Sequence, residues 1–408
     1  MTAPNEAELS ELSYLSSARA VRECALAAYA LGSRAELLHF TLDETRLPAL
    51  VERVLDVTRR RHADLAAIPY HARWRHFAAG GVDRMAALEP ALAGLRREER
   101  LRSLFELVIV SVLLDAGAGP AWSYREPSGA LLTRSEGLAI ASLRWFADGG
   151  LSTDPQGAPL RADAERLTRV APAALAEAFQ VSADNPLVGL EGRVEILQRL
   201  GRVVSEGPRF FGSQAPRLGN LALYLDAVAK NRELAATTLL ETVLAAFADI
   251  WPGRAVLAGK NLGDVWSHPR LGWVPLHKLS QWLTYSLCEP LEAAGIRITG
   301  LDELTGLAEY RNGGLFVDGG VLVPSEPRIW EEAFPVASSV VVEWRTLTVA
   351  LLDRTAALLR QRAGLSAEEL PLAKVLEGGT WFAGRELAFE RRPDGAPPIR
   401  VQSDGTVF

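Results

Sequence analysis

The sequence predicts a mainly α protein, a compact helical body with a small β-hairpin tail at its C-terminus. Much of the chain has apolar residues at helical spacing. Its composition, 48% hydrophobic and 23% charged residues, is typical of a globular protein with a sizeable core, and no repeat or long linker interrupts it. The 408 residues suffice for one large or two ordinary domains. We expect a helical domain over residues 1–376 and a tail over residues 377–408 packed on it.

The predicted helices follow one another along most of the chain. Residues 18–31 are rich in Ala and Leu and end at Gly32, a typical C-cap. Residues 47–61 carry apolar side chains at amphipathic spacing. Residues 101–115 are apolar on nearly every side, which predicts a buried central helix. Further helices are predicted at 135–146, 163–179 with a break near Pro172, 193–200, 224–248, 277–287 and 343–362.

The stretches that favour strands lie late in the chain. The β-branched run SSVVVEW near residue 340 fits either a short strand or the start of the helix that follows it. From Gly379 onward the sequence alternates and contains two Asp-Gly pairs, which are typical of tight turns. We therefore expect an extended or hairpin tail folded onto the helical body.

Charge and composition exclude several classes of protein. The net charge of −6 argues against a general nucleic-acid binder, because neutralising phosphates needs a basic surface. The most apolar run, residues 104–114, contains Glu106 and is too short to cross a bilayer. The polar start of the chain shows no secretory signal, and Cys24 and Cys288 have no metal-like spacing. We expect a cytoplasmic protein with reduced thiols that binds neither nucleic acid nor membrane.

An irregular segment at residues 68–84 gathers cationic side chains beside a pair of glycines. Its sequence, IPYHARWRHFAAGGVDR, places Arg73 and Arg75 two residues apart. A guanidinium matches a phosphate or carboxylate with two parallel hydrogen bonds, so both arginines are candidates for phosphate binding. A solvated basic turn explains the same residues about equally well. His71 and His76 are five residues apart, a poor metal spacing on a helix, so we predict no zinc site here.

A carboxylate ends the apolar helix predicted at residues 101–115. Asp115 precedes the Gly-rich turn of LLDAGAGPAWSYRE, where burial would require a cationic partner. Asp115 is therefore a candidate for ligand binding, with a structural cap at the helix end as the alternative. The later segment SADNPLVGLEGR is explained by ordinary turn chemistry.

Two further segments carry polar residues that packing explains poorly. In HKLSQWLTYSL, Lys278 and Gln281 lie on one face of an otherwise apolar helix, which favours a lined pocket over a solvent face. In LTGLAEYRNGGLFVDGG, the residues Glu309, Tyr310 and Arg311 are consecutive within an apolar, Gly-rich stretch. We interpret this triplet as functional. No familiar catalytic signature, such as GxSxG, a P-loop or HExxH, names its chemistry.

Several motifs occur in a fixed order along the chain: SVLLDAGAG with W-x-Y, RSEGLA, DNPLVGLEGR, NLGDVW-x-HP, HKLSQWLTYSL, LTGLAEYRNGGLFVDGGVL and SDGTVF. Together they resemble the uracil catabolism protein four family, from about residue 65 to the end of the chain. The resemblance implies a role in the ring-opening route of uracil degradation, in which urea must be freed from a ribosyl-urea phosphate. It implies a hydrolase that cuts this N-ribosidic bond without metal or organic cofactor and that can associate with other enzymes of uracil catabolism.

A more distant resemblance links the chain to the queuosine salvage N-glycosidases. HKLSQ and LTGLAEYR resemble the Lys-x-x-Gln and Leu-Thr-x-x-x-Asp-Tyr-Arg motifs of that family, whose helical fold is similar to that of DNA glycosylases. This resemblance implies that Lys278, Gln281, Glu309, Tyr310 and Arg311 belong to the site, with Glu309 standing where that family has Asp.

The expected chemistry is cleavage through an oxocarbenium-like sugar cation. A carboxylate stabilises such a cation and orients or deprotonates water. We expect Glu309 and Asp264 to be the catalytic residues. The residues expected to bind the phosphorylated ribosyl substrate are Lys278, Gln281, Tyr310, Arg311, Trp266, Asp115, Arg73 and Arg75. The alternatives are a non-catalytic protein that binds a uracil-derived nucleotide or scaffolds the ring-opening enzyme, and a nucleic-acid glycosylase, against which the acidic charge argues.

Overall fold

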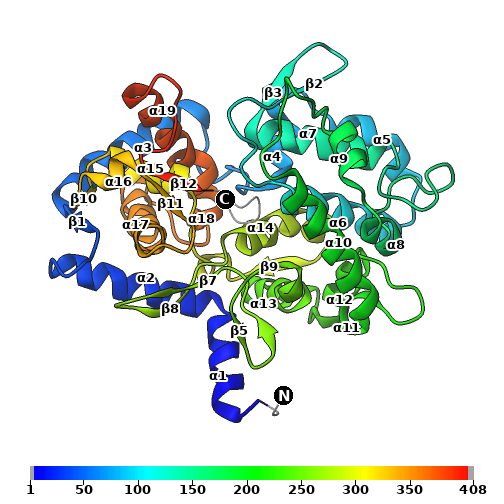
Figure 1. Cartoon of the computed structure of the whole chain (residues 1–408), viewed down its shortest axis with the longest axis horizontal. Coiled ribbons are helices and arrows are strands. Elements are labelled where there is room, and N and C mark those ends of the chain that lie inside the picture. Colours follow the sequence, from blue (N-terminus) through cyan, green and yellow to red (C-terminus); the bar gives the residue numbers. More distant parts are fainter. Residues whose placement is uncertain (1–3, 403–408) are drawn as a thin grey trace. The chain divides into compact units, whose positions relative to one another are not determined.

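The fold is mainly α, as the sequence predicts. The computed structural model describes residues 4–402, and all the strands among them are short and lie in two-stranded pairs (Figure 1). The described residues divide into two compact units that interleave along the sequence. Unit 1 comprises residues 4–71, 254–281 and 300–402, and unit 2 comprises residues 72–253 and 282–299.

Unit 1 holds both ends of the described chain. Its helices are α1 (Glu6–Leu15), α2 (Ala18–Ser33), α3 (Leu47–Arg61), α15 (Tyr310–Asp318), α16 (Arg328–Glu331), α17 (Ser339–Ala363), α18 (Leu372–Val375) and α19 (Trp381–Arg391), with a π-helix, η5 (Leu376–Thr380), and short 3₁₀ turns η1 (Glu44–Arg46) and η4 (Leu301–Glu303). Its strands are β1 (Phe40–Leu42), β5 (Val256–Leu257), β6 (Lys260–Asn261), β7 (Val265–His268), β8 (Gly272–Pro275), β10 (Leu322–Pro324), β11 (Ala333–Pro335) and β12 (Arg400–Gln402). Helix α14 (Lys278–Ala293) begins in unit 1 and continues into unit 2.

Unit 2 is also helical. Its helices are α4 (Arg73–Phe77), α5 (Met85–Ala93), α6 (Arg97–Leu113), α7 (Arg134–Ala147), α8 (Ala164–Thr168), α9 (Pro172–Ala178), α10 (Leu190–Glu206), α11 (Pro208–Phe211), α12 (Asn220–Val228) and α13 (Ala236–Ala246), with 3₁₀ turns η2 (Ala79–Gly81) and η3 (Ala248–Ile250). Its strands are β2 (Ser123–Arg125), β3 (Leu131–Thr133), β4 (Glu233–Ala235) and β9 (Arg297–Thr299).

Helix α17 is the centre of unit 1. Its N-cap Ser338 accepts a hydrogen bond from the backbone N–H of Val341, and Gly364 ends it in the left-handed conformation (φ 68°). The run SSVVVEW therefore starts this helix and forms no strand. Residues 340–352 are buried throughout, because α2 and α3 pack against α17 although they are distant in sequence (Figure 1). One part of this core joins Val21 and Ala25 of α2 to residues of β8 and α17.

Helix α6 is the buried central helix of unit 2, as predicted. It carries a carboxylate within its apolar surface: Glu106 is fully buried and receives hydrogen bonds from Arg217 (2.6 and 3.0 Å) and from the backbone N–H of Gly219 (3.0 Å) and Ala162 (3.1 Å). Burial raises the pKa of Glu106, although Arg217 and the backbone donors oppose this shift. The glutamate connects α6 to two segments that lie far away in the sequence.

The helix predicted at residues 224–248 is interrupted. Helix α12 ends at Val228, and α13 begins only at Ala236. Between them Asn231 (φ 52°) and Arg232 (φ 63°) adopt left-handed backbone conformations, which end the helical path and lead into β4. The predicted break near Pro172 is correct, since α8 ends before it and α9 starts at it.

The end of the described chain differs from the expected extended tail. Residues 381–391, expected to be extended, form helix α19, which packs against α15. The tertiary contact explains the difference, because Gly384 of α19 lies against the backbone carbonyl of Arg311. Strand β12 is extended, but it pairs in parallel with β11 and not with a neighbour in the tail. The motif SDGTVF, residues 403–408, lies outside the described residues.

Glycine at position 201 is expected to be essential for packing within unit 2. A Cβ atom there would lie 2.6 Å from the carbonyl oxygen of Ala164 and 2.6 Å from the backbone nitrogen of Thr168. We expect Gly201→Ala to lower the free energy of unfolding by about 1–3 kcal/mol, because overpacking outweighs the better helix propensity of Ala. Urea denaturation measures the change. Gly94→Ala is the control, since its Cβ would approach nothing closer than 3.6 Å, and equal stability of the two variants would contradict the packing argument.

No helix between residues 4 and 402 combines the length and apolar character that crossing a membrane requires. Cys24 and Cys288 both carry free thiols.

Candidate functional site

The residues that the sequence predicts for the site fall in both units. Those in unit 1 are Asp264, Trp266, Lys278, Gln281, Glu309, Tyr310 and Arg311, and those in unit 2 are Arg73, Arg75 and Asp115.

Glu309 is the N-cap of helix α15. Its carboxylate accepts hydrogen bonds from the backbone N–H groups of Arg311 (2.6 Å) and Asn312 (2.6 Å), and its side chain is buried, with 7% of the residue exposed. The first N–H groups of a helix have no partner within the helix and carry partial positive charge. These donors therefore favour the ionised form of Glu309 and oppose the effect of its burial.

Two opposing effects set the protonation of Glu309. Burial raises the pKa of its carboxyl group above the usual range, while the two backbone hydrogen bonds and the positive charges of Lys278 and His71 lower it. The net shift is upward. Glu309 is thus a buried carboxyl with an adjacent lysine, and its pKa is moved towards neutrality, which suits a general base.

Asp264 is held by an ion pair that the sequence analysis does not anticipate. Arg345 of α17 donates to both of its oxygens (2.8 Å each), and both residues are buried. The indole N–H of Trp266 (2.6 Å) and the backbone N–H of Lys278 (2.9 Å) also donate to Asp264. Burial opposes ionisation of Asp264, but Arg345 and these donors hold its pKa below the usual range.

This geometry suits a positioning role for Asp264 better than proton transfer. Its carboxylate fixes Lys278 at the first residue of α14, and Arg345 also donates to the carbonyl of Ala308 (3.1 Å), directly before Glu309. Asp264 and Arg345 therefore fix the backbone beside both Lys278 and Glu309.

The residue before Lys278 has an unusual backbone. His277 adopts φ 46°, a conformation that non-glycine residues rarely take, and its Nε2 donates to the carbonyl oxygen of Leu15 (2.7 Å). Its own backbone N–H faces the carbonyl of Asp264 (3.4 Å). Such a conformation costs about 1–3 kcal/mol and persists only where surrounding contacts enforce it. Here those contacts set the direction in which α14 starts.

Gln281 joins the two motif segments of the site. Its Nε2 lies 2.6 Å from Oγ1 of Thr305, and its Oε1 accepts from the backbone N–H of Thr305 (2.9 Å). Both residues are fully buried. Both polar groups of the Gln281 side chain thus bond Thr305, which lies in the chain segment that leads to Glu309. The structure indicates that Gln281 supports the site by holding this segment in place.

We expect loss of the Thr305 hydroxyl to destabilise the protein. Thr305→Val leaves the side-chain NH2 group of Gln281 with a long contact to the carbonyl of Leu276 (3.4 Å) in place of its short bond to the hydroxyl, so the free energy of unfolding should fall by about 1–3 kcal/mol. Chemical denaturation measures this change. Thr348→Val is the matched control, because the buried hydroxyl of Thr348 bonds the carbonyl of Trp344 within its own helix. An equal loss in both variants would contradict the prediction.

The residues that follow Glu309, Tyr310 and Arg311, lie against each other and against the end of the described chain. Arg311 donates to the carbonyl of Gly395 (2.8 Å), and its guanidinium lies 5.2 Å from the ring centre of Tyr310.

Asn312, in the same helical turn, is fully buried, and neither atom of its side-chain amide has a hydrogen-bond partner among residues 4–402. An unsatisfied buried amide is costly, so Asn312 is a second unusual residue beside Glu309 that sequence reasoning missed.

In unit 2, Arg73 and Asp115 form a buried ion pair. Nη1 of Arg73 lies 3.1 Å from Oδ1 of Asp115, and its Nε donates to the hydroxyl of Ser111 (2.7 Å). Burial lowers the pKa of Arg73, and Asp115 counteracts this shift. Arg75 is only partly buried and pairs with Glu289 (2.6 Å). Asp115, which follows helix α6, thus has in Arg73 the cationic partner that burial of its carboxylate requires.

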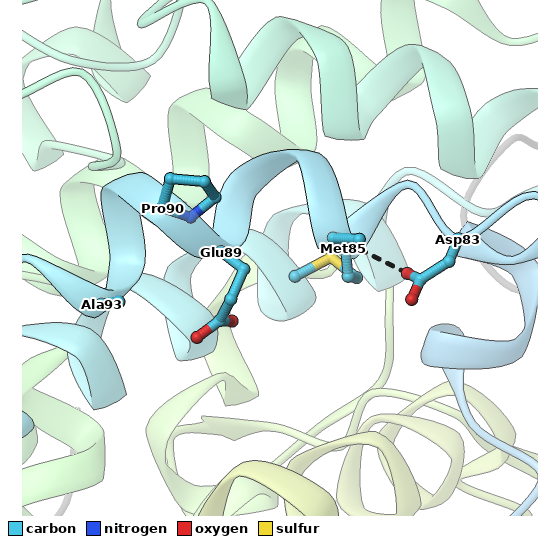
Figure 2. A pocket seen from close by; sticks show the side chains of 6 residues that line it. Asp83, Met85, Glu89, Pro90 and Ala93 are labelled. Carbon is cyan, nitrogen blue, oxygen red and sulfur yellow. Dashed lines mark hydrogen bonds between the residues drawn. The ribbon is translucent and has the colours of Figure 1, made fainter.

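Other candidate sites are poor. Among residues 4–402, no group of three or more His, Cys, Asp or Glu side chains could hold a metal ion. A shallow pocket in unit 2 is lined by residues of α5 and by Asp83, two residues before its start, which accepts a hydrogen bond from the N–H of Ala86 (3.1 Å; Figure 2). Glu89 on this pocket is already paired with Arg100 (2.8 Å). No residue that the sequence predicts for the site lies on it.

Fold and site together define a mainly helical protein in which a buried glutamate at the start of one helix lies beside a lysine at the start of another. Residues 14–408 match the family described as "Protein of unknown function (DUF1688)", and the chain belongs to this family. It is 38% identical over 380 residues to "Protein urg3" of Schizosaccharomyces pombe (strain 972 / ATCC 24843), covering 91% of this chain and 92% of that protein. It is 37% identical over 409 residues to "Uracil catabolism protein 4" of Lachancea kluyveri, with the same coverage of 91% and 92%. The resemblance inferred from the ordered motifs is confirmed.

Proposed function

We propose that this protein acts in uracil catabolism and hydrolyses the N-ribosidic bond of a ribosyl-urea 5-phosphate, releasing urea. The name of the Lachancea kluyveri relative supports the pathway. The proposed reaction rests on the site and on the motif resemblance to queuosine salvage N-glycosidases. The observation that carries it is the buried carboxyl of Glu309 beside the charge of Lys278.

The site residues have distinct roles in this proposal. Glu309 takes a proton from water as the water oxygen attacks C1′, and its negative charge stabilises the cation that develops on the ribose. The C1′–N bond breaks, its electron pair stays on the urea nitrogen, and this nitrogen takes up the proton that Glu309 received from water. Lys278 keeps Glu309 ionised between turnovers. Asp264 is a positioning residue, because it acts through the backbone of Lys278. Tyr310, Arg311 and Trp266 provide aromatic and cationic groups near these residues. The contacts that the sequence predicts for Arg73, Arg75 and Asp115 of unit 2 stay predictions.

A direct assay tests the proposed reaction. The purified full chain is incubated with ribosyl-urea 5-phosphate, and urea and ribose 5-phosphate are quantified. We expect the two products in equal amounts, formed at a rate proportional to protein concentration. Absence of both products at high protein concentration would contradict the proposed function.

One observation favours a second function. Both oxygens of Glu309 accept helix N–H groups, which is also what a purely structural cap does. A non-catalytic protein that binds a uracil-derived nucleotide, or that associates with another enzyme of the pathway, would need no more than this. Tight binding of the ribosyl compound by calorimetry without product formation would support this alternative.

A further inference from the structure

Asn312 is a buried polar residue that the proposed mechanism leaves unused. It lies in the first turn of helix α15, and neither Nδ2 nor Oδ1 of its side chain has a hydrogen-bond partner among residues 4–402. Nearly all buried polar groups of native proteins are paired, because an unpaired group loses its hydrogen bonds to water without replacement. An amide whose donor and acceptor are both unpaired therefore indicates a role other than packing.

The side chain of Asn312 starts close to the carboxylate of Glu309. The backbone nitrogen of Asn312 lies 2.6 Å from Oε1 of Glu309. Because Cα is bonded to this nitrogen, it lies within about 4 Å of the same oxygen. In a helix the Cα–Cβ bond leans towards the N-terminus, so the amide extends towards the end of α15 that Glu309 caps.

The usual structural role of a polar residue at this position does not apply to Asn312. The third residue of a helix often accepts a hydrogen bond from the backbone N–H of the N-cap residue. Here the N-cap is Glu309, and its N–H donates to the carbonyl oxygen of Leu307 (2.9 Å). The buried amide of Gln281 shows the contrast, because its Nε2 and Oε1 both bond Thr305. Capping therefore does not explain Asn312.

A second buried donor lies against the same turn. Gly313 follows Asn312, and a Cβ atom there would lie 2.8 Å from Nε1 of Trp344, so only glycine lets the indole approach this closely. Trp344 is buried, and its indole N–H also lacks a hydrogen-bond acceptor within the described part of the chain. A buried tryptophan N–H usually finds a partner. Two side chains at one helical turn thus carry unpaired polar atoms, which favours a ligand site over a single packing defect.

We propose that Asn312 is a specificity-determining residue that binds the ureido group of the substrate. This inference rests on the proposed function. A primary amide and a ureido group are complementary, because each has an N–H donor beside a carbonyl acceptor. Nδ2 of Asn312 donates to the ureido carbonyl oxygen, and Oδ1 accepts from the terminal NH2 group. As the C1′–N bond breaks, negative charge spreads from the urea nitrogen onto this carbonyl oxygen, so the hydrogen bond from Nδ2 becomes stronger.

A comparison of two substrates tests this pairing. In N-acetyl-ribosylamine 5-phosphate a methyl group replaces the terminal NH2 of ribosyl-urea 5-phosphate, so the carbonyl remains but the donor to Oδ1 is lost. Formation of ribose 5-phosphate measures both reactions. We expect the wild-type kcat/KM to be about 10–10²-fold lower on the acetyl substrate, because Oδ1 stays unpaired in that complex.

The variant Asn312→Leu should remove this discrimination. Leucine has a similar shape and no polar atoms, so kcat/KM on the ureido substrate should fall by about 10²–10³-fold. The variant should then distinguish the two substrates by less than about threefold, because the group that senses the terminal NH2 is gone. Glu309→Asp is the control for the chemical step. It should slow both substrates by the same factor, since Glu309 acts on water and not on the ureido group.

Stability separates a ligand-binding amide from a structural one. Without ligand, Asn312→Leu should keep or raise the thermal midpoint, because it removes an unpaired amide. Gln281→Met removes a paired amide and should lower the midpoint by several degrees. Thermal unfolding of the full chain measures both shifts.

Three results would overturn the assignment of Asn312 while the proposed function stands. The first is a wild-type protein that hydrolyses both substrates equally well, and the second is wild-type discrimination retained in Asn312→Leu. The third is a thermal midpoint of Asn312→Leu lowered as much as that of Gln281→Met, because the amide would then be structural. A wild-type protein that releases no urea would overturn the proposed function itself, and the ureido contact with it.

Discussion

Glu309→Gln should reduce urea release by about 10²–10⁴-fold while leaving the thermal midpoint unchanged or slightly higher. Because burial raises the pKa of Glu309, the folded state disfavours its ionised form. The ionised carboxyl therefore lowers stability as the pH rises through its raised pKa, and the neutral amide removes this penalty. The amide oxygen can still accept one of the two helix N–H groups. Loss of activity without loss of stability is the signature of a functional residue.

Two controls separate catalysis from capping. Ser338→Ala removes the N-cap of α17 and should lower stability by about 1 kcal/mol without lowering activity. Glu309→Asp keeps the charge but shortens the side chain, so it should retain more activity than Glu309→Gln. Thermal unfolding and the urea assay measure both quantities. Full activity of Glu309→Gln would remove this residue from the mechanism.

The dependence of the rate on pH is an independent test of Glu309 as the general base. The wild-type rate should fall as the pH drops through the raised pKa of Glu309, because protonation removes the base. The fall should therefore occur at a higher pH than for an ordinary glutamate. Residual activity of Glu309→Gln should lack this fall. An identical acid limb in the variant would assign it to another group.

Local pattern predicts much of the helical body but not the end of the chain. Helix α6 is predicted because its residues are apolar on every side, and α3 because its spacing is amphipathic. Helix α19 is not, since the aromatic residues of WFAGRELAFER resemble an alternating strand. Its contact with α15 through Gly384 decides its conformation, and no local pattern contains that contact. Tertiary packing overrides local preference here.

The same distinction holds for the site. Glu309 and Lys278 are predicted because each is a polar residue in an apolar, motif-bearing segment. Arg345 is not, because it lies within a long apolar helix and its partner Asp264 is 81 residues away. The pairing of His71 with Glu377 spans 306 residues. Spacing reveals residues that are unusual locally, whereas long-range partners become visible only when the fold brings them together.

The Asp264–Arg345 pair is expected to have the largest effect on stability. Arg345→Met leaves the buried carboxylate of Asp264 without its cation, and Asp264→Asn leaves the buried guanidinium without its anion. Either change should lower the free energy of unfolding by about 3–5 kcal/mol, since an uncompensated buried charge is costly. Chemical denaturation measures it. Glu23→Gln, which breaks an exposed pair with Arg19, should change stability by less than about 1 kcal/mol.

The double variant and the pH dependence test the reason for this loss. Because most of the cost comes from the orphaned charge, Asp264→Asn/Arg345→Met should be less destabilised than the sum of the single variants. The pKa of Asp264 is lowered in the fold, so its contribution is present above the unfolded pKa and is lost as the pH falls through the folded pKa. The wild-type advantage over Asp264→Asn should therefore shrink only in acid. Strict additivity, or an advantage that disappears near neutral pH, would mean that the pair stabilises the start of α14 by some means other than its charge.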